Sequence, residues 1–144
     1  MRTFTAAVLL FLLPACMLFR GVRMKEFTCR TEQGYETITL FIPSGYTREK
    51  MVLDSIGGKE QFYNYDNGAI LYFAKNPGWL TENAPLIHGQ KARGSSQQTY
   101  KGIDRDGLQW KEVQIEGFRF GYSYVPAASV EKFDRAISYI RIRN

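Results

Sequence analysis

The sequence predicts an α+β domain: an antiparallel sheet, made of a hairpin and a three-stranded meander, with a C-terminal helix packed on one face. Two turn signals predict the sheet, because Asn67-Gly68 and Asp106-Gly107 each separate runs rich in aromatic and β-branched residues. Apolar residues at helical spacing between positions 130 and 140 predict the helix. With 44% hydrophobic and 15% aromatic residues, the chain has the composition of a folded domain with its own core.

A pair of strands is expected first, at residues 27–30 and 35–42. In the second run, apolar and other residues alternate as in a half-buried strand: Ile38, Leu40 and Ile42 against Thr37, Thr39 and Phe41. Pro43-Ser44-Gly45 would end this pair. Residues 47–53 then suit a short helix or a strand equally well. Cys29, in the first strand, is expected to be a small buried hydrophobe.

The next element is a hairpin around Asn67-Gly68. Both residues tolerate positive φ, which a two-residue type I′ turn requires. Such a turn would set Tyr65 opposite Ile70 and Tyr63 opposite Tyr72. Apolar groups would then meet on both faces of the hairpin.

A second two-residue turn is expected at Asp106-Gly107, where it opens the meander. Its register would set Ile103 opposite Trp110 and Lys101 opposite Glu112. Both pairs are complementary, and such cross-strand pairs stabilise a sheet by roughly 0.2 to 1 kcal/mol each.

Glu116-Gly117 would fold the third strand of the meander back on the second. Val113 would then lie against Phe120, and Ile115 against Phe118. One face of the last strand is wholly aromatic and must be covered: Phe118, Phe120, Tyr122 and Tyr124.

The C-terminal helix would supply that cover. Its apolar stripe consists of Val130, Phe133, Ile137 and Ile140. Ser129 is the expected N-cap, and Pro126 separates the helix from the preceding strand. Residues 140–143 would fray or add a short edge strand.

The first sixteen residues form a leader. Arg2 is followed by an apolar run from Phe4 and then by Leu13-Pro14-Ala15-Cys16. This leader resembles the type II signal peptide of bacterial lipoproteins, whose lipobox ends in the cysteine that receives the lipid. The resemblance implies a signal peptide at 1–15, a lipid-anchored tether at 16–24 and a single α+β domain at 25–144. It also implies lipidation of Cys16, with palmitate or a similar acyl chain, and a place in the cell envelope facing the periplasm or the exterior.

Other interpretations of the leader stay open. Ordinary signal peptidase could remove it, it could remain as an uncleaved anchor, or translation could start at Met24. If Cys16 carries lipid, no internal disulfide can form, since Cys29 is the one other cysteine. Three of the 19 cations precede Lys25, which leaves 16 cations against 14 acids in the domain. This small excess, without a basic stripe, predicts no nucleic-acid partner.

The stretch from Asn76 to Gln97 is the longest irregular segment, and loops of this length are commonly functional or mobile. Trp79 and His88 are its candidate partner-binding residues. An aromatic anchor such as Trp79 suits a binding hot spot, although it could equally plug the loop onto the sheet. One histidine without nearby cysteines or clustered acids predicts no metal site.

No catalytic residue is predicted, because the serines lack a nucleophile frame and one histidine would have to serve every triad. No cofactor motif occurs either, so the sequence favours a protein that is not an enzyme. Two alternatives stay open. One is a small envelope hydrolase that uses acidic residues near the 76–97 loop, and the other is an inhibitor or immunity-type protein.

Three segments carry a resemblance in layout: Phe41-Ile42-Pro43-Ser44-Gly45-Tyr46, Tyr65-Asp66-Asn67-Gly68 and residues 133–140. Across residues 35–142 they resemble the Mog1/PsbP-like α/β/α sandwich. That resemblance implies an accessory or binding protein, here one that contacts an unknown envelope protein. It transfers no functional residue, because a fold shared by many proteins does not specify one activity.

Overall fold

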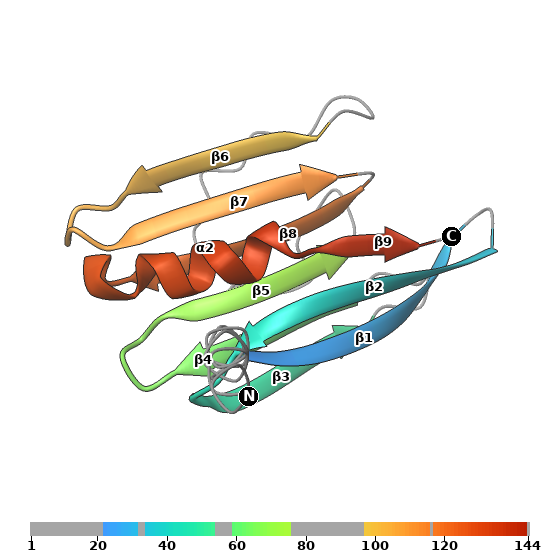
Figure 1. Ribbon diagram of the computed structural model, residues 1–144, viewed down its shortest axis with the longest axis horizontal. Helices are drawn as coiled ribbons and strands as arrows, with labels where there is room; N and C mark the ends of the chain where they lie inside the picture. The colour runs from blue at the N-terminus through green and yellow to red at the C-terminus, as the bar shows by residue number, and fades with distance from the viewer. Residues whose placement is uncertain (1–21, 32–33, 54–58, 76–96, 116, 144) are drawn as a thin grey trace, which may run out of the picture.

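The computed structural model describes residues 22–31, 34–53, 59–75, 97–115 and 117–143. Within these ranges the chain forms nine strands, one α-helix and a short 3-10 turn (Figure 1). The strands are β1 Val22–Thr31, β2 Gly34–Pro43, β3 Tyr46–Leu53, β4 Lys59–Tyr65, β5 Ile70–Lys75, β6 Gln98–Ile103, β7 Gln109–Ile115, β8 Phe118–Val125 and β9 Arg141–Arg143. The 3-10 turn η2 covers Ala127–Ser129, and helix α2 covers Val130–Ser138.

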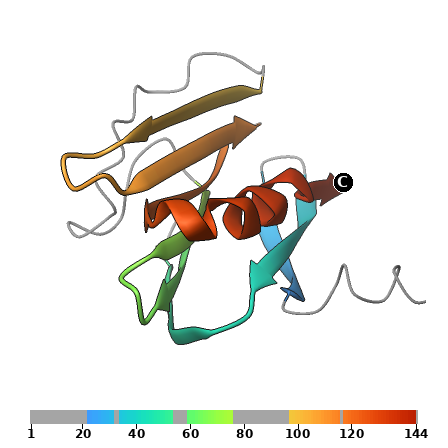
Figure 2. The ribbon, with the colours of Figure 1, turned by 60° about the vertical axis from the view of Figure 1, so that its left-hand side comes forward.

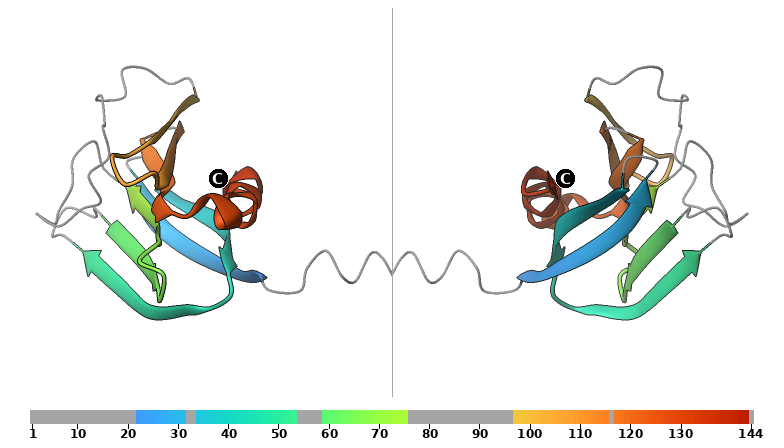
Figure 3. Two further views of the ribbon diagram at one scale, coloured as in Figure 1. Left: turned by 90° about the vertical axis from the view of Figure 1, so that its left-hand side faces the viewer. Right: turned by 90° about the vertical axis from the view of Figure 1, so that its right-hand side faces the viewer.

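These strands form two antiparallel sheets. The larger has six strands in the order β3-β4-β5-β8-β7-β6, and the smaller has three in the order β1-β2-β9. The side views show the smaller sheet and α2 on the same side of the larger sheet (Figures 2 and 3). Together, α2 and the smaller sheet form a second layer over one face of the six strands.

The prediction of an α+β class is therefore wrong, because the described chain is dominated by strands. A helix is about 10 Å wide, whereas six strands at about 4.8 Å spacing span roughly 24 Å. One short helix cannot cover that width. The strand pair β1–β2, whose place in the fold was not predicted, forms the second sheet with β9 and covers the rest of the aromatic face.

Several local predictions are confirmed. β1 pairs with β2 along its whole length, from Val22 with Pro43 to Thr31 with Gly34. β1 therefore begins before Lys25, within the segment expected to be a tether. The C-terminal residues add the short edge strand β9 beside β2. Of the two options left open for residues 47–53, the strand is the one that forms.

The first hairpin occurs where it was predicted, but its register is shifted by one residue. Ile70 pairs with Asn64 rather than with Tyr65. Gly68 adopts a positive φ of 81°, whereas Asn67 does not, so the turn is not type I′. Tyr65 N donates to Ala69 O, which closes a three-residue loop ending in the left-handed glycine.

The hairpin at Asp106-Gly107 is shifted in the same way. Trp110 pairs with Gly102 rather than with Ile103, and Glu112 pairs with Tyr100 rather than with Lys101. The cause is local, because the Asp104 carboxylate accepts hydrogen bonds from two backbone N–H groups of the turn and stabilises the longer loop. The third hairpin has the predicted register, with Val113 against Phe120 and Ile115 against Phe118.

The core lies between the six-stranded sheet and the second layer. Stacked rings of Phe73, Phe118 and Phe120 form its centre. From the smaller sheet, Phe27 stacks on Phe73 at 5.8 Å between ring centroids. From α2, Phe133 meets Tyr65 at 5.0 Å and Tyr122 at 5.7 Å. The predicted apolar stripe of the helix therefore does face the aromatic strand, as its spacing indicated.

Candidate functional site

The candidate residues inferred from the sequence, Cys16, Trp79 and His88, lie outside the residues that the structure describes. Of the predicted loop, Gln97 is described, and it is exposed. Cys29 does lie in β1, as predicted. The described part of the chain instead shows two polar clusters and one exposed patch that the sequence did not reveal.

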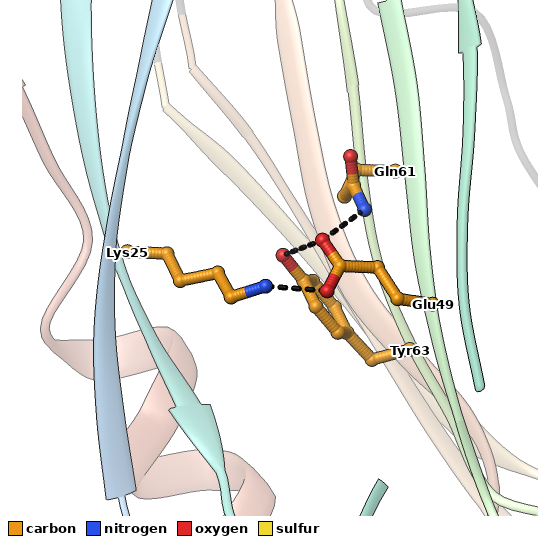
Figure 4. A network of polar contacts seen from close by, with 4 residues as sticks. All are labelled: Lys25, Glu49, Gln61 and Tyr63. Atoms are coloured by element: carbon orange, nitrogen blue, oxygen red, sulfur yellow. Dashed lines mark hydrogen bonds and ion pairs between the residues drawn. The ribbon is translucent and has the colours of Figure 1, made fainter. Parts of the chain in front are cut away.

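The first cluster is a clasp between the two sheets, formed by Lys25, Glu49, Gln61 and Tyr63 (Figure 4). Lys25 Nζ on β1 lies 2.5 Å from Glu49 Oε2 on β3. On β4, Gln61 Nε2 donates to Glu49 Oε1 at 2.8 Å, and Tyr63 OH donates to the same oxygen at 3.5 Å. Both oxygens of Glu49 are therefore engaged. Since β1 and β3 are edge strands of different sheets, the clasp joins the two layers along this edge.

Aromatic rings hold the lysine of the clasp. Lys25 Nζ lies 5.0 Å from the centroid of the Tyr63 ring and 5.5 Å from that of Tyr46. Burial lowers the pKa of Lys25, but the hydrogen bond and charge of Glu49 more than offset it, so the net pKa is raised. Burial, with the charge of Glu49 adding to it, raises the pKa of Tyr63. At neutral pH the clasp therefore holds Lys25 as an ammonium and Tyr63 as a protonated phenol, both in contact with the Glu49 side chain.

We expect the Lys25–Glu49 pair to contribute about 1 kcal/mol of coupling, because its side chains are only 27% and 38% exposed. A double-mutant cycle of Lys25→Met and Glu49→Gln, measured by denaturant unfolding at neutral pH, would give this value. The raised pKa of Lys25 means that its contribution is complete below about pH 10.5 and is lost as pH rises through the folded-state pKa.

The Glu131–Arg135 pair on the solvent side of α2 provides a matched control for the clasp. It is an i,i+4 pair with side chains 86% and 42% exposed, for which about 0.3–0.5 kcal/mol is usual. A coupling at the clasp no larger than that of the control would contradict a role in joining the sheets.

The second cluster lies on the other face of the six-stranded sheet and is buried. Glu112 is fully buried there and accepts a hydrogen bond from Tyr72 OH at 3.0 Å and another from Gln114 Nε2. Arg119 Nη1 lies 3.9 Å from Glu112 Oε1. The absence of a side chain at Gly121 leaves space for the Tyr72 ring, because a Cβ at position 121 would lie 2.1 Å from the Tyr72 hydroxyl oxygen. The arrangement balances a buried carboxylate with a cation and two donors, as burial of a charge requires.

Sequence reasoning missed both clusters for identifiable reasons. Along β8, Arg119 and Ser123 alternate with the aromatic residues, and both are buried, although the sequence predicted a cover for the aromatic face alone. The shifted register separates Glu112 from Lys101, its expected partner. One signal in the sequence could have indicated this cluster. On the face that carries Glu112, strands that are otherwise rich in aromatic residues have polar or small residues, such as Gln114, Arg119 and Gly121.

The exposed patch lies on the solvent side of the smaller sheet, and we call it the outer patch. Along β2, Leu40 and Ile42 point into the core, so Phe41 points outward. Its ring meets Tyr139 at 5.4 Å. The outer patch consists of Met24, Tyr35, Phe41, Tyr139, Arg141 and Arg143. Three of its apolar or aromatic residues are strongly exposed, Met24 by 62%, Tyr35 by 70% and Tyr139 by 42%.

The comparisons with known proteins add no family assignment. No protein-family model, curated protein or solved structure matches the chain. In the described ranges, no three histidine, cysteine or acidic side chains come together as a metal site would need. Across the same ranges, α2 included, there is no helix with the length and apolar character needed to cross a bilayer.

Proposed function

We propose that the chain is an envelope lipoprotein whose domain binds a partner at a membrane surface and has no catalytic role. In this proposal the leader 1–15 is removed, Cys16 carries lipid, and the domain faces the periplasm or the exterior. Acyl chains on Cys16 would contribute about 0.8 kcal/mol per buried methylene, enough to hold the domain at a bilayer without a spanning helix.

One observation supports the proposal that the domain has no catalytic role: three acidic side chains are engaged in contacts that hold the fold together. Glu49 binds Lys25, Gln61 and Tyr63. Glu112 binds Tyr72, Gln114 and Arg119 in the same manner. Asp134 of α2 accepts from Lys111 and Tyr122 at 2.8 and 3.0 Å. For any of them to act as a general base, contacts that hold the layers or strands together would have to break.

The buried phenols support the same conclusion. Burial, with the negative charge of Glu112 or Asp134 adding to it, raises the pKa of Tyr72 and Tyr122. Each phenol therefore keeps its proton at neutral pH and donates a hydrogen bond to the neighbouring acidic side chain. These tyrosines serve as structural donors rather than as proton acceptors for a substrate.

The proposed partner contact is the 76–97 loop, with Trp79 as its anchor. The full-length chain would first be cross-linked on the native membrane to identify the bound envelope protein. Trp79→Ala should then weaken the measured Kd by about 30-fold or more, the equivalent of a hot-spot loss of about 2 kcal/mol. His88→Ala is the comparison in the same loop: in this proposal Trp79 is the anchor and His88 is a solvated loop residue, so its replacement should change the Kd little.

A melting curve on each variant separates binding from folding. If Trp79→Ala lowers the thermal midpoint by many degrees, Trp79 plugs the loop onto the domain instead of contacting a partner. If the variant melts normally and binds normally, the loop is not the interface, and the proposal fails in this part.

A further inference from the structure

The outer patch combines apolar, aromatic and cationic side chains on one exposed face, on which Glu26, opposite Thr39 in the register, is an exposed acid. Tyrosine has an apolar ring and a polar tip, which suits the boundary between lipid and water. Arg141 and Arg143, the two cations of the outer patch, are exposed on β9. Arginine binds phosphate oxygens through a planar fork of donors. This combination matches the chemistry of a phospholipid head-group layer.

The charge of the whole second layer points the same way. In Figure 1, β1, β2, β9 and α2 lie in front of the six-stranded sheet, so their solvent sides face one direction. The exposed cations described on that side are Arg135, Arg141 and Arg143, and the exposed acids are Glu26 and Glu131. One of these acids, Glu131, is already paired with Arg135. The side therefore carries a positive excess that complements an anionic surface.

The position of Cys16 brings this face close to the bilayer. Cys16 precedes Val22, the first residue of β1, by six positions. At no more than about 3.5 Å per residue, the lipid attachment lies within roughly 20 Å of the start of β1. Met24 of the outer patch is only two residues further along the same strand. A domain held this closely can reach the membrane with the outer patch.

We infer that the outer patch docks onto anionic phospholipid head groups of the membrane to which the chain is anchored. The inference rests on the proposed function, because the lipid on Cys16 supplies the proximity. Docking would fix how the domain faces its partner, since the six-stranded sheet would then point away from the bilayer. Binding by the outer patch itself does not require the lipid, so the two can be tested apart.

The test uses the mature chain from residue 16 with Cys16→Ser, which contains every described contact. Its binding to vesicles of phosphatidylcholine with about one-third phosphatidylglycerol, and to vesicles of phosphatidylcholine alone, is measured by co-sedimentation at low salt. We expect clear preference for the anionic vesicles. Each cation near such a surface strengthens binding about fivefold, so Arg141→Glu/Arg143→Glu should weaken it at least about 30-fold.

The matched control reverses two exposed cations on the β6–β7 hairpin, Lys101→Glu/Arg105→Glu, at the far edge of the larger sheet. It changes the net charge equally and should weaken binding far less. Met24→Ser/Tyr139→Ser should weaken binding by a factor that salt does not change, because apolar contacts are not screened. Melting curves verify that every variant is folded.

The inference is overturned if the folded chain binds both vesicle types equally or neither of them. It is also overturned if the control reversal weakens binding as much as the reversal at Arg141 and Arg143, since net charge alone would then explain the effect. Fatty-acid labelling of Cys16 is a separate measurement. Vesicle binding without such labelling would refute the proposed lipid anchor and leave the docking face intact.

Discussion

Replacement of Cys16 by serine is expected to release the protein from the membrane fraction and to abolish incorporation of labelled fatty acid. The lipobox-like segment Leu13-Pro14-Ala15-Cys16 presents one thiol as the acyl acceptor. Serine has a similar size but is not a substrate for thioether formation with a diacylglycerol. Loss of all acyl chains removes the roughly 0.8 kcal/mol per methylene on which the proposed anchoring depends.

The measurement is membrane fractionation together with metabolic labelling. Cys29→Ser is the control, because it removes the other cysteine of the chain while leaving the lipobox unchanged. It should stay labelled and membrane-bound. Unchanged labelling and retention in the Cys16→Ser protein would contradict the lipoprotein proposal. Release with no labelling in either the wild type or the variant would favour removal of the leader by ordinary signal peptidase.

Phe133→Ala should destabilise the domain by about 3–5 kcal/mol, as measured by denaturant titration. The Phe133 side chain is 2% exposed and packs edge-on against Tyr65 and at a tilt against Tyr122. Its removal leaves a cavity between α2 and the six-stranded sheet that rigid neighbouring rings cannot fill. Since a domain of this size is stabilised by only about 5–15 kcal/mol in total, the loss is a large part of its stability.

Arg135→Ala is the control on the same helix, with an exposed side chain two residues away. A change within about 0.5 kcal/mol is expected for a substitution at such a surface position. A loss below about 1 kcal/mol for Phe133→Ala would be incompatible with the helix packing described above. Equal losses in both variants would mean that the loss at Phe133 does not come from its burial, because alanine has a higher helix propensity than either residue that it replaces.

The features of the fold that depend on residues close together in the sequence, its turns and its helix, could be predicted. Asn67-Gly68 and Asp106-Gly107 do form turns, and the spacing of Val130, Phe133 and Ile137 does produce a helix that buries Phe133 and Ile137. These features depend on backbone preferences and side-chain periodicity within a few residues. The interpretation of the leader also rests on a local pattern, and it remains a prediction.

The register and the partition of strands could not be predicted in this way. A two-residue and a three-residue loop fit the same dipeptide, and the difference of one residue depends on side chains such as Asp104 that accept hydrogen bonds from the turn. Whether β1–β2 joined the main sheet or covered it depends on the area of aromatic surface left exposed by α2. That quantity exists only once the six strands are assembled.

The sequence alone predicted most of the strands, the positions of the turns and the amphipathic helix, and it is the basis of the expectation of a lipid anchor at Cys16. Only the tertiary structure decided that the second layer is largely a sheet, that Lys25 and Glu49 clasp the layers across 24 residues of sequence, and that Glu112 is buried among donors. The outer patch, too, could be found only in the tertiary structure, because folding brings Phe41 and Tyr139 into contact. Local preferences act between neighbours along the chain, whereas burial and pairing across layers are properties of the assembled fold.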